Sequence, residues 1–350
     1  MAGSVHCEPD VEESESLRSD ANIAGPMADP VPGPRPADSA PVAVPVPVPA
    51  GLPVSRGMVA PSMPRPEQTR VMVVANQKGG VGKTTTTVNL AASLALHGNR
   101  VLVIDLDPQG NASTALGIDH HADVPSIYDV LVDNKQLSDV VQPVTEVEGL
   151  FCAPATIDLA GAEIELVSLV ARESRLDRAI KAYEQPLDYI LIDCPPSLGL
   201  LTVNALVAGA EVLIPIQCEY YALEGLGQLL RNVELVRGHL NPKLHVSTIL
   251  LTMYDGRTRL ASQVADEVRT HFGQEVLRTS IPRSVRISEA PSYGQTVLTY
   301  DPGSSGALSY LEAAREIALR GIGVHYDGTR AHTVGHQQQQ DQHSMSEGLQ

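Results

Sequence analysis

Short apolar runs alternate with longer amphipathic segments through most of this chain. The runs lie at residues 71–75, 101–104, 189–192, 212–216 and 246–251. Continuous apolar runs of this length predict strands that are covered on both faces. Segments with helical spacing separate them, for example 84–97, 164–183 and 223–240. Because strands that alternate with helices build a parallel sheet, the pattern predicts a doubly wound α/β domain with a mostly parallel sheet flanked by helices.

The two ends of the chain differ from this pattern. Residues 1–69 are acidic near their start and repeat proline at 40–50 too densely for a helix or a central strand. They predict a disordered arm of polyproline II character, without the basic start and apolar core of a secretory signal. Residues 325–350 are rich in Gln and His and predict a second disordered tail. The folded domain is therefore expected to span residues 70–324.

Composition narrows the class of protein. The net charge of −16 argues against a nucleic-acid partner when taken alone, although a local basic surface can still bind phosphates. No stretch approaches about 18 uninterrupted apolar residues, so no membrane span is expected. The cysteines lack the spacing of metal ligands and predict buried, reduced thiols of a cytoplasmic protein. They are Cys7, Cys152, Cys194 and Cys218.

The stretch from 76 to 85, Asn-Gln-Lys-Gly-Gly-Val-Gly-Lys-Thr-Thr, follows the first apolar run directly. It departs from the standard Walker A pattern by one residue, because Gln77 stands where the first glycine is required. Glycines in such a loop let backbone N–H groups converge on anionic oxygens. Lys83 supplies charge for the β- and γ-phosphates, the Thr84 hydroxyl is placed for Mg²⁺, and Thr85 opens a helix whose N-terminus favours phosphate. The stretch predicts a nucleoside triphosphate site.

Aspartates follow two later strands. Asp105 and Asp107 come directly after the 101–104 run, and Asp193 ends the 189–192 run. The carboxyl ends of parallel strands share one edge of a sheet, so these loops and the glycine-rich loop are expected there together. Four apolar residues followed by Asp form the Walker B arrangement, in which the Asp193 carboxylate polarises a water of the Mg²⁺ shell.

These segments resemble the ParA/MinD group of deviant Walker A P-loop ATPases, and specifically its ParA/Soj chromosome-partition branch. The resemblance covers about residues 70–323. The matching motifs lie at 78–84, 105–111, 192–196 and 281–294. It implies an ATPase that uses ATP and Mg²⁺ and hydrolyses slowly unless a partner stimulates it.

The resemblance also implies roles for individual residues. Lys78 is the signature lysine that crosses to the phosphates of a second chain, and Gly79 stays small so that the two loops can approach. Asp107 orients the attacking water, while Asp105 supports the Mg²⁺ shell or the switch backbone, with a helix cap or loop hydrogen bond as the alternative. The expected catalytic residues are Asp107, Lys78 and Lys83. The expected nucleotide contacts are Lys78, Gly79, Gly80, Val81, Gly82, Lys83, Thr84, Thr85 and Pro282, and the metal contacts are Thr84, Asp193 and Asp105.

The resemblance further implies an ATP-dependent homodimer that binds DNA nonspecifically, associates with the nucleoid and is released by a ParB-like centromere-binding protein. Candidate phosphate contacts are Arg257, Arg259, Arg283 and Arg286. The proline-rich arm is a candidate for recruiting a polar or scaffold protein.

Other functions on the same fold remain open. A MinD-like membrane switch is the main alternative, but such proteins end in a basic amphipathic helix and the polar tail here has none. A metabolic enzyme of the superfamily is a further alternative; for the nitrogenase iron protein the cysteines lack the motif context. Plasmid-type relatives that repress their own operon carry an N-terminal helix-turn-helix, which the acidic, proline-rich arm does not resemble.

Overall fold

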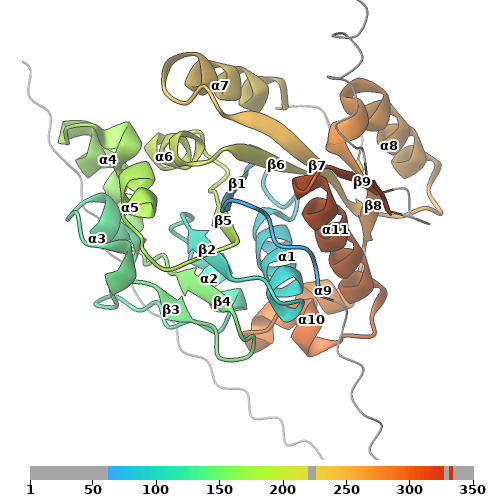
Figure 1. Ribbon diagram of the computed structural model, residues 1–350, viewed down its shortest axis with the longest axis horizontal. Helices are drawn as coiled ribbons and strands as arrows, with labels where there is room; N and C mark the ends of the chain where they lie inside the picture. The colour runs from blue at the N-terminus through green and yellow to red at the C-terminus, as the bar shows by residue number, and fades with distance from the viewer. Residues whose placement is uncertain (1–61, 220–225, 327–330, 334–350) are drawn as a thin grey trace, which may run out of the picture. The chain divides into compact units, whose positions relative to one another are not determined.

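The structure, a computed structural model, describes residues 62–219, 226–326 and 331–333 (Figure 1). The strands are β1 (Arg70–Val74), β2 (Val101–Asp105), β3 (Gln142–Pro143), β4 (Leu150–Ala153), β5 (Tyr189–Asp193), β6 (Glu211–Gln217), β7 (His245–Tyr254), β8 (Val276–Pro282), β9 (Val324–Tyr326) and β10 (Ala331–Thr333). The α-helices are α1 (Lys83–Leu96), α2 (Asn111–Ala115), α3 (Ile127–Leu131), α4 (Leu159–Ser168), α5 (Arg175–Lys181), α6 (Leu200–Ala208), α7 (Leu226–His239), α8 (Arg259–Phe272), α9 (Val285–Glu289), α10 (Val297–Tyr300) and α11 (Ser305–Gly321). The 3₁₀ turns are η1 (Leu137–Asp139), η2 (Arg172–Ser174), η3 (Gly273–Glu275) and η4 (Ala290–Tyr293).

Within the described residues, β1 to β8 form one sheet in the order β3-β4-β2-β5-β1-β6-β7-β8. Every neighbouring pair is parallel except β3 and β4. β1 lies between β5 and β6, with Val73 opposite Ile192 on one side and Val212 on the other. The predicted doubly wound, mostly parallel sheet flanked by helices is confirmed, and the loops after β1, β2 and β5 leave the sheet at one edge.

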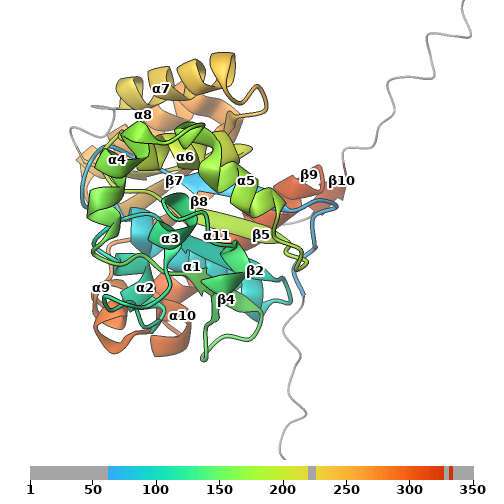
Figure 2. The same cartoon turned by 90° about the vertical axis from the view of Figure 1, so that its left-hand side faces the viewer.

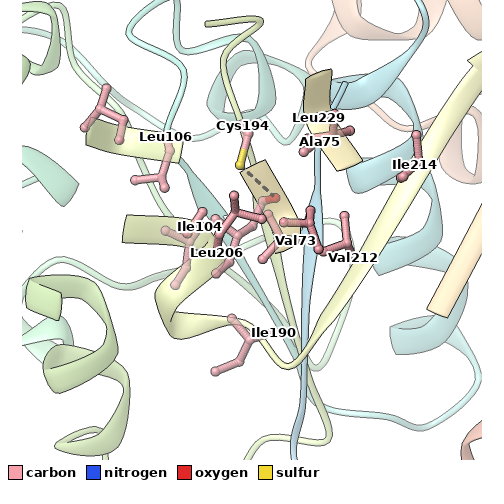
Figure 3. Packing of buried hydrophobic residues seen from close by; sticks show 14 of the residues in the cluster. Val73, Ala75, Ile104, Leu106, Ile190, Cys194, Leu206, Val212, Ile214 and Leu229 are labelled. Atoms are coloured by element: carbon pink, nitrogen blue, oxygen red, sulfur yellow. Dashed lines mark hydrogen bonds between the residues drawn. The ribbon is translucent and has the colours of Figure 1, made fainter. Parts of the chain in front are cut away.

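Alternate strand residues point into two separate hydrophobic cores. Val73 packs with α3 to α8 on one face, whereas Val74 packs with α1 and α11 on the other. Figures 1 and 2 show these two helical layers on either side of the sheet. Figure 3 shows the first core, to which β2 contributes Ile104, β5 contributes Ile190, β1 contributes Val73 and β6 contributes Val212 and Ile214. Because both faces of the sheet are covered, its strands carry continuous apolar runs.

A buried ion pair joins the strands at the opposite, amino-terminal edge. The Arg70 guanidinium donates to both carboxylate oxygens of Glu211 at 2.7 Å and to the Ile317 carbonyl at 2.7 Å. Burial by itself raises the pKa of Glu211, but the hydrogen bonds from Arg70 outweigh it and hold that pKa below its usual value. The pair therefore connects β1 and β6 to α11.

One predicted helix is interrupted. The amphipathic segment 164–183 predicted a continuous helix, but α4 begins earlier, at Leu159, and ends at Ser168. Leu169 is extended and Ala171 has a left-handed backbone with φ +52°, which no α-helix accommodates. The chain turns there through η2, so that α5 lies beside α6 and Leu176 is buried. Residues 223–225 of the predicted helix 223–240 lie outside the described residues.

The ends of the domain also differ in detail from the predicted boundaries. Most of the predicted arm lies outside the described residues, but Met63 is buried against the domain and its N–H donates to the His97 carbonyl at 3.0 Å. Within the predicted tail, β9 and β10 pair as antiparallel strands. Cys152, Cys194 and Cys218 are buried free thiols, as expected, while Cys7 lies outside the described residues. In the described ranges, no helix is long and apolar enough to cross a bilayer.

Candidate nucleotide site and basic edge

The loop between β1 and α1 is held open by contacts from neighbouring strands. Asn76 donates from Nδ2 to the Pro215 carbonyl at 2.8 Å and accepts the N–H of Lys78 at 3.0 Å. Thr252 donates from Oγ1 to the Val81 carbonyl at 2.8 Å. Gly82 has a left-handed backbone with φ +87° and caps the start of α1. The loop is therefore a fixed turn whose N–H groups remain available at a helix N-terminus.

Small residues leave the mouth of this loop open. A Cβ at Gly79 or Gly80 would meet no atom within 4 Å. Gly80 also has a left-handed backbone with φ +75°, which favours glycine. The two glycines thus border open space among the described residues.

The two lysines of the loop lie in different surroundings. Lys83 is 7% exposed, and its Nζ donates to the Lys78 carbonyl at 3.4 Å. Burial lowers the pKa of Lys83, while the nearby carboxylates of Asp193 and Asp107 oppose that shift. The Lys78 side chain instead points to the rim, where its Nζ lies 4.0 Å from Glu219. The Lys83 side chain therefore lies inside the loop, whereas the Lys78 side chain points away from it.

Asp193 ends β5, and one of its two carboxylate oxygens has no hydrogen-bond donor among the described residues. Its Oδ1 accepts the Thr87 hydroxyl at 3.2 Å, and its Oδ2 is buried without a hydrogen-bond partner among the described residues. Burial, followed by repulsion from Asp105, raises the pKa of Asp193 to about 8, while the Thr84 and Thr87 hydroxyls oppose that shift. A buried carboxylate oxygen with no donor fits a hydrated divalent cation, so the residues present suit Mg²⁺ at this position.

The rest of the metal-ligand set is sparse. Outside the masked segments, no group of three or more His, Cys, Asp or Glu side chains could hold a metal ion. Mg²⁺ in phosphoryl-transfer sites takes few protein ligands and completes its shell with water and phosphate oxygens. One hydroxyl and one carboxylate, from Thr84 and Asp193, are consistent with that arrangement.

The loop after β2 is organised around a completely buried carboxylate. Asp105 accepts the N–H of Asp107 at 3.1 Å, and it accepts the N–H and hydroxyl of Ser113 at 2.9 and 2.8 Å. Burial raises the pKa of Asp105 to about 6, against the effect of these hydrogen bonds. Asp107 is 9% exposed and accepts the N–H of Gln109 at 3.0 Å. These contacts occupy both carboxylate oxygens of Asp105 and tie it to its own loop and to α2.

The remaining predicted contacts lie further along the same edge. Pro282 ends β8 opposite Tyr254 of β7, and the Arg283 N–H donates to the Tyr254 carbonyl at 3.3 Å. Three of the four arginines are paired with carboxylates of the chain: Arg257 with Asp255, Arg283 with Glu219, and Arg286 with Glu289 and Asp301. Arg259 begins α8 and forms no ion pair with another of the described residues. The structure thus places all four in the segments that follow β7 and β8, with Arg259 at the start of α8 and Arg286 within α9.

Several residues at this site were not singled out by the sequence analysis. Glu219 binds both Lys78 and Arg283, and so links the glycine-rich loop to the basic segment. Thr87, one turn into α1, and Ser113 hold the two buried aspartates. A hydroxyl one helical turn after Lys83 could have indicated Thr87, but no pattern in the sequence identifies Glu219.

The loop, the Walker B carboxylate and the parallel sheet define a P-loop nucleotide-binding domain of the ParA/MinD type. The family model described as an AAA domain matches residues 69–246. The sporulation initiation inhibitor protein Soj of Bacillus subtilis is 57% identical over 253 residues, which are 72% of this chain and 99% of that protein. The chromosome partitioning protein ParA of Caulobacter vibrioides is 52% identical over 72% of this chain and 94% of its own length. The chain belongs to the ParA/Soj family of chromosome-partitioning ATPases.

A solved structure agrees with this assignment. The cobyrinic acid a,c-diamide synthase of Mycobacterium smegmatis, solved with a bound ATP analogue and magnesium, superposes with a TM-score of 0.62. It is 40% identical, and the match covers 71% of this chain and 94% of that one. The fold of the nucleotide domain is therefore shared beyond the partition proteins, and the fold alone does not define the cellular task.

Proposed function

We propose that this chain is an ATP-driven DNA-partition switch. In this proposal two ATP-bound chains form a nucleotide-sandwich dimer, the dimer binds DNA nonspecifically, and a ParB-like centromere-binding protein stimulates hydrolysis and release. The homology to Soj and ParA supports the partition role. The protein is then cytoplasmic and nucleoid-associated, and ATP changes its affinity for DNA rather than making a product for use elsewhere.

The observation that carries the proposal is the different placement of the two loop lysines. Lys83 is buried over its own loop, whereas the Lys78 side chain is one-third exposed at the rim. A cation at the rim is positioned to neutralise phosphates that belong to a second chain. ATP bound by both chains would then hold the dimer together.

In this proposal, different groups of the loop contact different parts of ATP. The N–H groups around Gly80 and Gly82 donate hydrogen bonds to phosphate oxygens, and Lys83 neutralises the β- and γ-phosphates. Thr84 and Asp193 hold Mg²⁺, which supplies charge neutralisation at the phosphates when it is bound. These residues bind and orient ATP without reacting with it.

Hydrolysis depends on the loop after β2. Asp107 lies in this loop two residues after Asp105, and its N–H donates to the Asp105 carboxylate. In this proposal the Asp107 carboxylate orients the attacking water. Few other catalytic groups lie nearby, which fits a slow basal rate that a partner increases. Asp105 fixes this loop through Ser113. The four arginines after β7 and β8 provide phosphate contacts for DNA.

The proposal is tested by measuring molecular mass and DNA co-sedimentation with ATP, with ADP and without nucleotide. The wild type is expected to dimerise only with ATP and to sediment with DNA much more strongly with ATP than with ADP or without nucleotide. Asp107→Ala is expected to remain a DNA-bound dimer, because ATP persists. Lys83→Ala is expected to fail at nucleotide binding and therefore at both later steps. Equal DNA binding by the wild type in all three conditions would show that the protein is not a nucleotide-dependent switch.

A further inference from the structure

The outer side of α4 carries an apolar surface that the proposed nucleotide and DNA contacts do not use. On the inner side of this helix, Leu159, Ala162 and Leu166 are buried. The outer side presents Ile157, Ala160, Gly161, Ile164 and Val167, which we call the α4 stripe. Ile164 is 79% exposed, and Val170 just beyond the helix is 87% exposed. The stripe repeats with helical spacing and contains no charged residue.

The shape of the α4 stripe suits a helix. Ala160 and Gly161 are small and lie in sequence between the two large exposed side chains of Ile157 and Ile164. Amphipathic helices bind such surfaces with anchors spaced three, four or seven residues apart. α4 itself lies in the outer layer next to α3 and α6 (Figure 2). An exposed apolar group of this kind on a helix marks an interaction site.

The charges around the α4 stripe favour a basic ligand. Asp158 and Glu165 are exposed beside it, and the Glu165 carboxylate accepts the uncharged Tyr128 hydroxyl at 3.1 Å. Arg172, the basic side chain next to the stripe, is already occupied by Glu173 at 2.9 Å and by the Val167 carbonyl at 2.8 Å. The rim is therefore negative on a protein that is itself acidic.

These charges argue against other occupants. A two-fold contact between two α4 stripes would place Asp158 and Glu165 against their own copies. An anionic membrane surface would be repelled by the same carboxylates. The chain's own arm is acidic at residues 8–15 and rich in proline at 40–50, so it matches neither the charge nor the helical shape.

The position of α4 connects the stripe to both switch loops. At its start, the Ala155 N–H donates to the Ser113 hydroxyl at 3.2 Å, and that hydroxyl donates to Asp105 at 2.8 Å. On its inner side, the Glu163 carboxyl lies so close to Gly199, in the loop that follows Asp193, that a Cβ there would collide with it. Pressure on the outer side of α4 therefore reaches the loop that orients water and the loop beside the metal site.

We propose that the α4 stripe is the docking site for a basic amphipathic helix of the partner that stimulates ATP hydrolysis, an inference that rests on the proposed partition function. The partner helix places apolar side chains around Ile164 and Val167 and its basic residues against Asp158 and Glu165. Docking there moves α4 against the two switch loops and so increases the rate of hydrolysis.

The test uses the full chain with Ile164→Ser/Val167→Ser as the stripe variant. Leu235→Ser/Leu308→Ser is the matched control, because those leucines are similarly exposed, at 60% and 54%, on α7 and α11. ATP hydrolysis is measured against the concentration of the ParB-like partner. The stripe variant is expected to need about 10-fold more partner for half-maximal stimulation, from two lost apolar anchors. Its basal rate, its ATP-dependent DNA binding and its melting temperature are expected to match those of the wild type and the control.

Stimulation of the stripe variant at the wild-type partner concentration would overturn the docking site. So would loss of its ATP-dependent dimer in light scattering, because a second copy would then be the occupant. If the partner fails to stimulate the wild type, the proposed partition function fails instead. The docking site is then judged with two synthetic peptides of about 18 residues, or five helical turns, one of Leu and Lys and one of Leu and Glu. Selective binding of the Lys peptide that the stripe variant loses supports the site, and equal binding to both proteins overturns it.

Discussion

Replacing Ser113 by alanine separates the two roles that are open for Asp105. The Ser113 hydroxyl donates to Asp105 at 2.8 Å and accepts the Ala155 N–H at 3.2 Å, so the substitution removes both contacts. A hydrogen bond to a charged group contributes about 1.5–3 kcal/mol, and an unsatisfied buried N–H costs about 1–3 kcal/mol. We expect the free energy of unfolding to fall by about 3 kcal/mol. The backbone N–H of residue 113 still donates to Asp105, so part of the anchoring remains.

Urea unfolding and Mg²⁺ titration of ATP hydrolysis provide the measurements. If Asp105 anchors the switch loop, Ser113→Ala and Asp105→Asn both destabilise the protein and slow hydrolysis at an unchanged Mg²⁺ requirement. Ser168→Ala is the control, because its exposed hydroxyl only donates to a carbonyl within α4. A large rise in the Mg²⁺ requirement for Asp105→Asn, together with a neutral Ser113→Ala, would refute the anchoring role and place Asp105 at the metal.

Two further substitutions test the framework around the site. Glu211→Gln is expected to cost about 3–5 kcal/mol at pH 7 by leaving the buried Arg70 charge unpaired. Because the folded pKa of Glu211 is lowered, the pair stabilises the protein above the unfolded pKa of 4.5 and this contribution is lost as pH falls through the folded pKa. The difference between wild type and variant in urea unfolding should therefore narrow below pH 4.5, and a constant gap would contradict this reasoning. Gly82→Ala forces a left-handed alanine, at a cost of about 1–2 kcal/mol, into the phosphate loop. Calorimetry should show weakened ATP binding, whereas Gly273→Ala, at a position that also has a positive φ but lies in an open environment after α8, should leave ATP affinity unchanged.

The sequence predicted the nucleotide edge well because its signals are local. A glycine-rich turn between an apolar run and a helix can be recognised without any tertiary information, and Asp193 follows from the length of the run before it. β4 and β8 were not predicted. The first is only four residues long and includes the partly exposed Phe151, and the second contains polar residues from Arg278 to Ser280. Their strand conformation depends on pairing with β2 and β7.

The break between α4 and α5 and the role of Glu219 could not be predicted for a related reason. The left-handed Ala171 is imposed by packing, since nothing in its own side chain favours that conformation. Glu219 forms ion pairs with Lys78 and Arg283, which are 205 residues apart in the sequence. Its role therefore depends on the fold that brings these two side chains together. Contacts of this kind belong to the tertiary structure and leave no periodic pattern in the sequence.

The pairing of the arginines explains how an acidic protein can bind DNA and gives a final prediction. Arg257, Arg283 and Arg286 are 90%, 63% and 55% exposed, and their ion pairs are at the surface. An exposed ion pair contributes only about 0–1 kcal/mol, so each arginine loses little when it leaves its carboxylate. Its new contact with a DNA phosphate is also only weakly favourable. Binding then requires many arginines at once, which a dimer provides.

The dependence of DNA affinity on salt measures that number. Each neutralised phosphate contributes about −0.9 to the slope of log affinity against log salt, so four arginines give about −3.6 and the eight of a dimer about −7. We expect the slope for Asp107→Ala to be about twice as steep with ATP as with ADP. Equal slopes in the two states would show that the arginines after β7 and β8 do not act together across a dimer, and would move the DNA contact to another surface. Substituting Arg259, which begins α8 and has no ion-pair partner among the described residues, should reduce the slope in the ATP state by about 2, one phosphate for each chain.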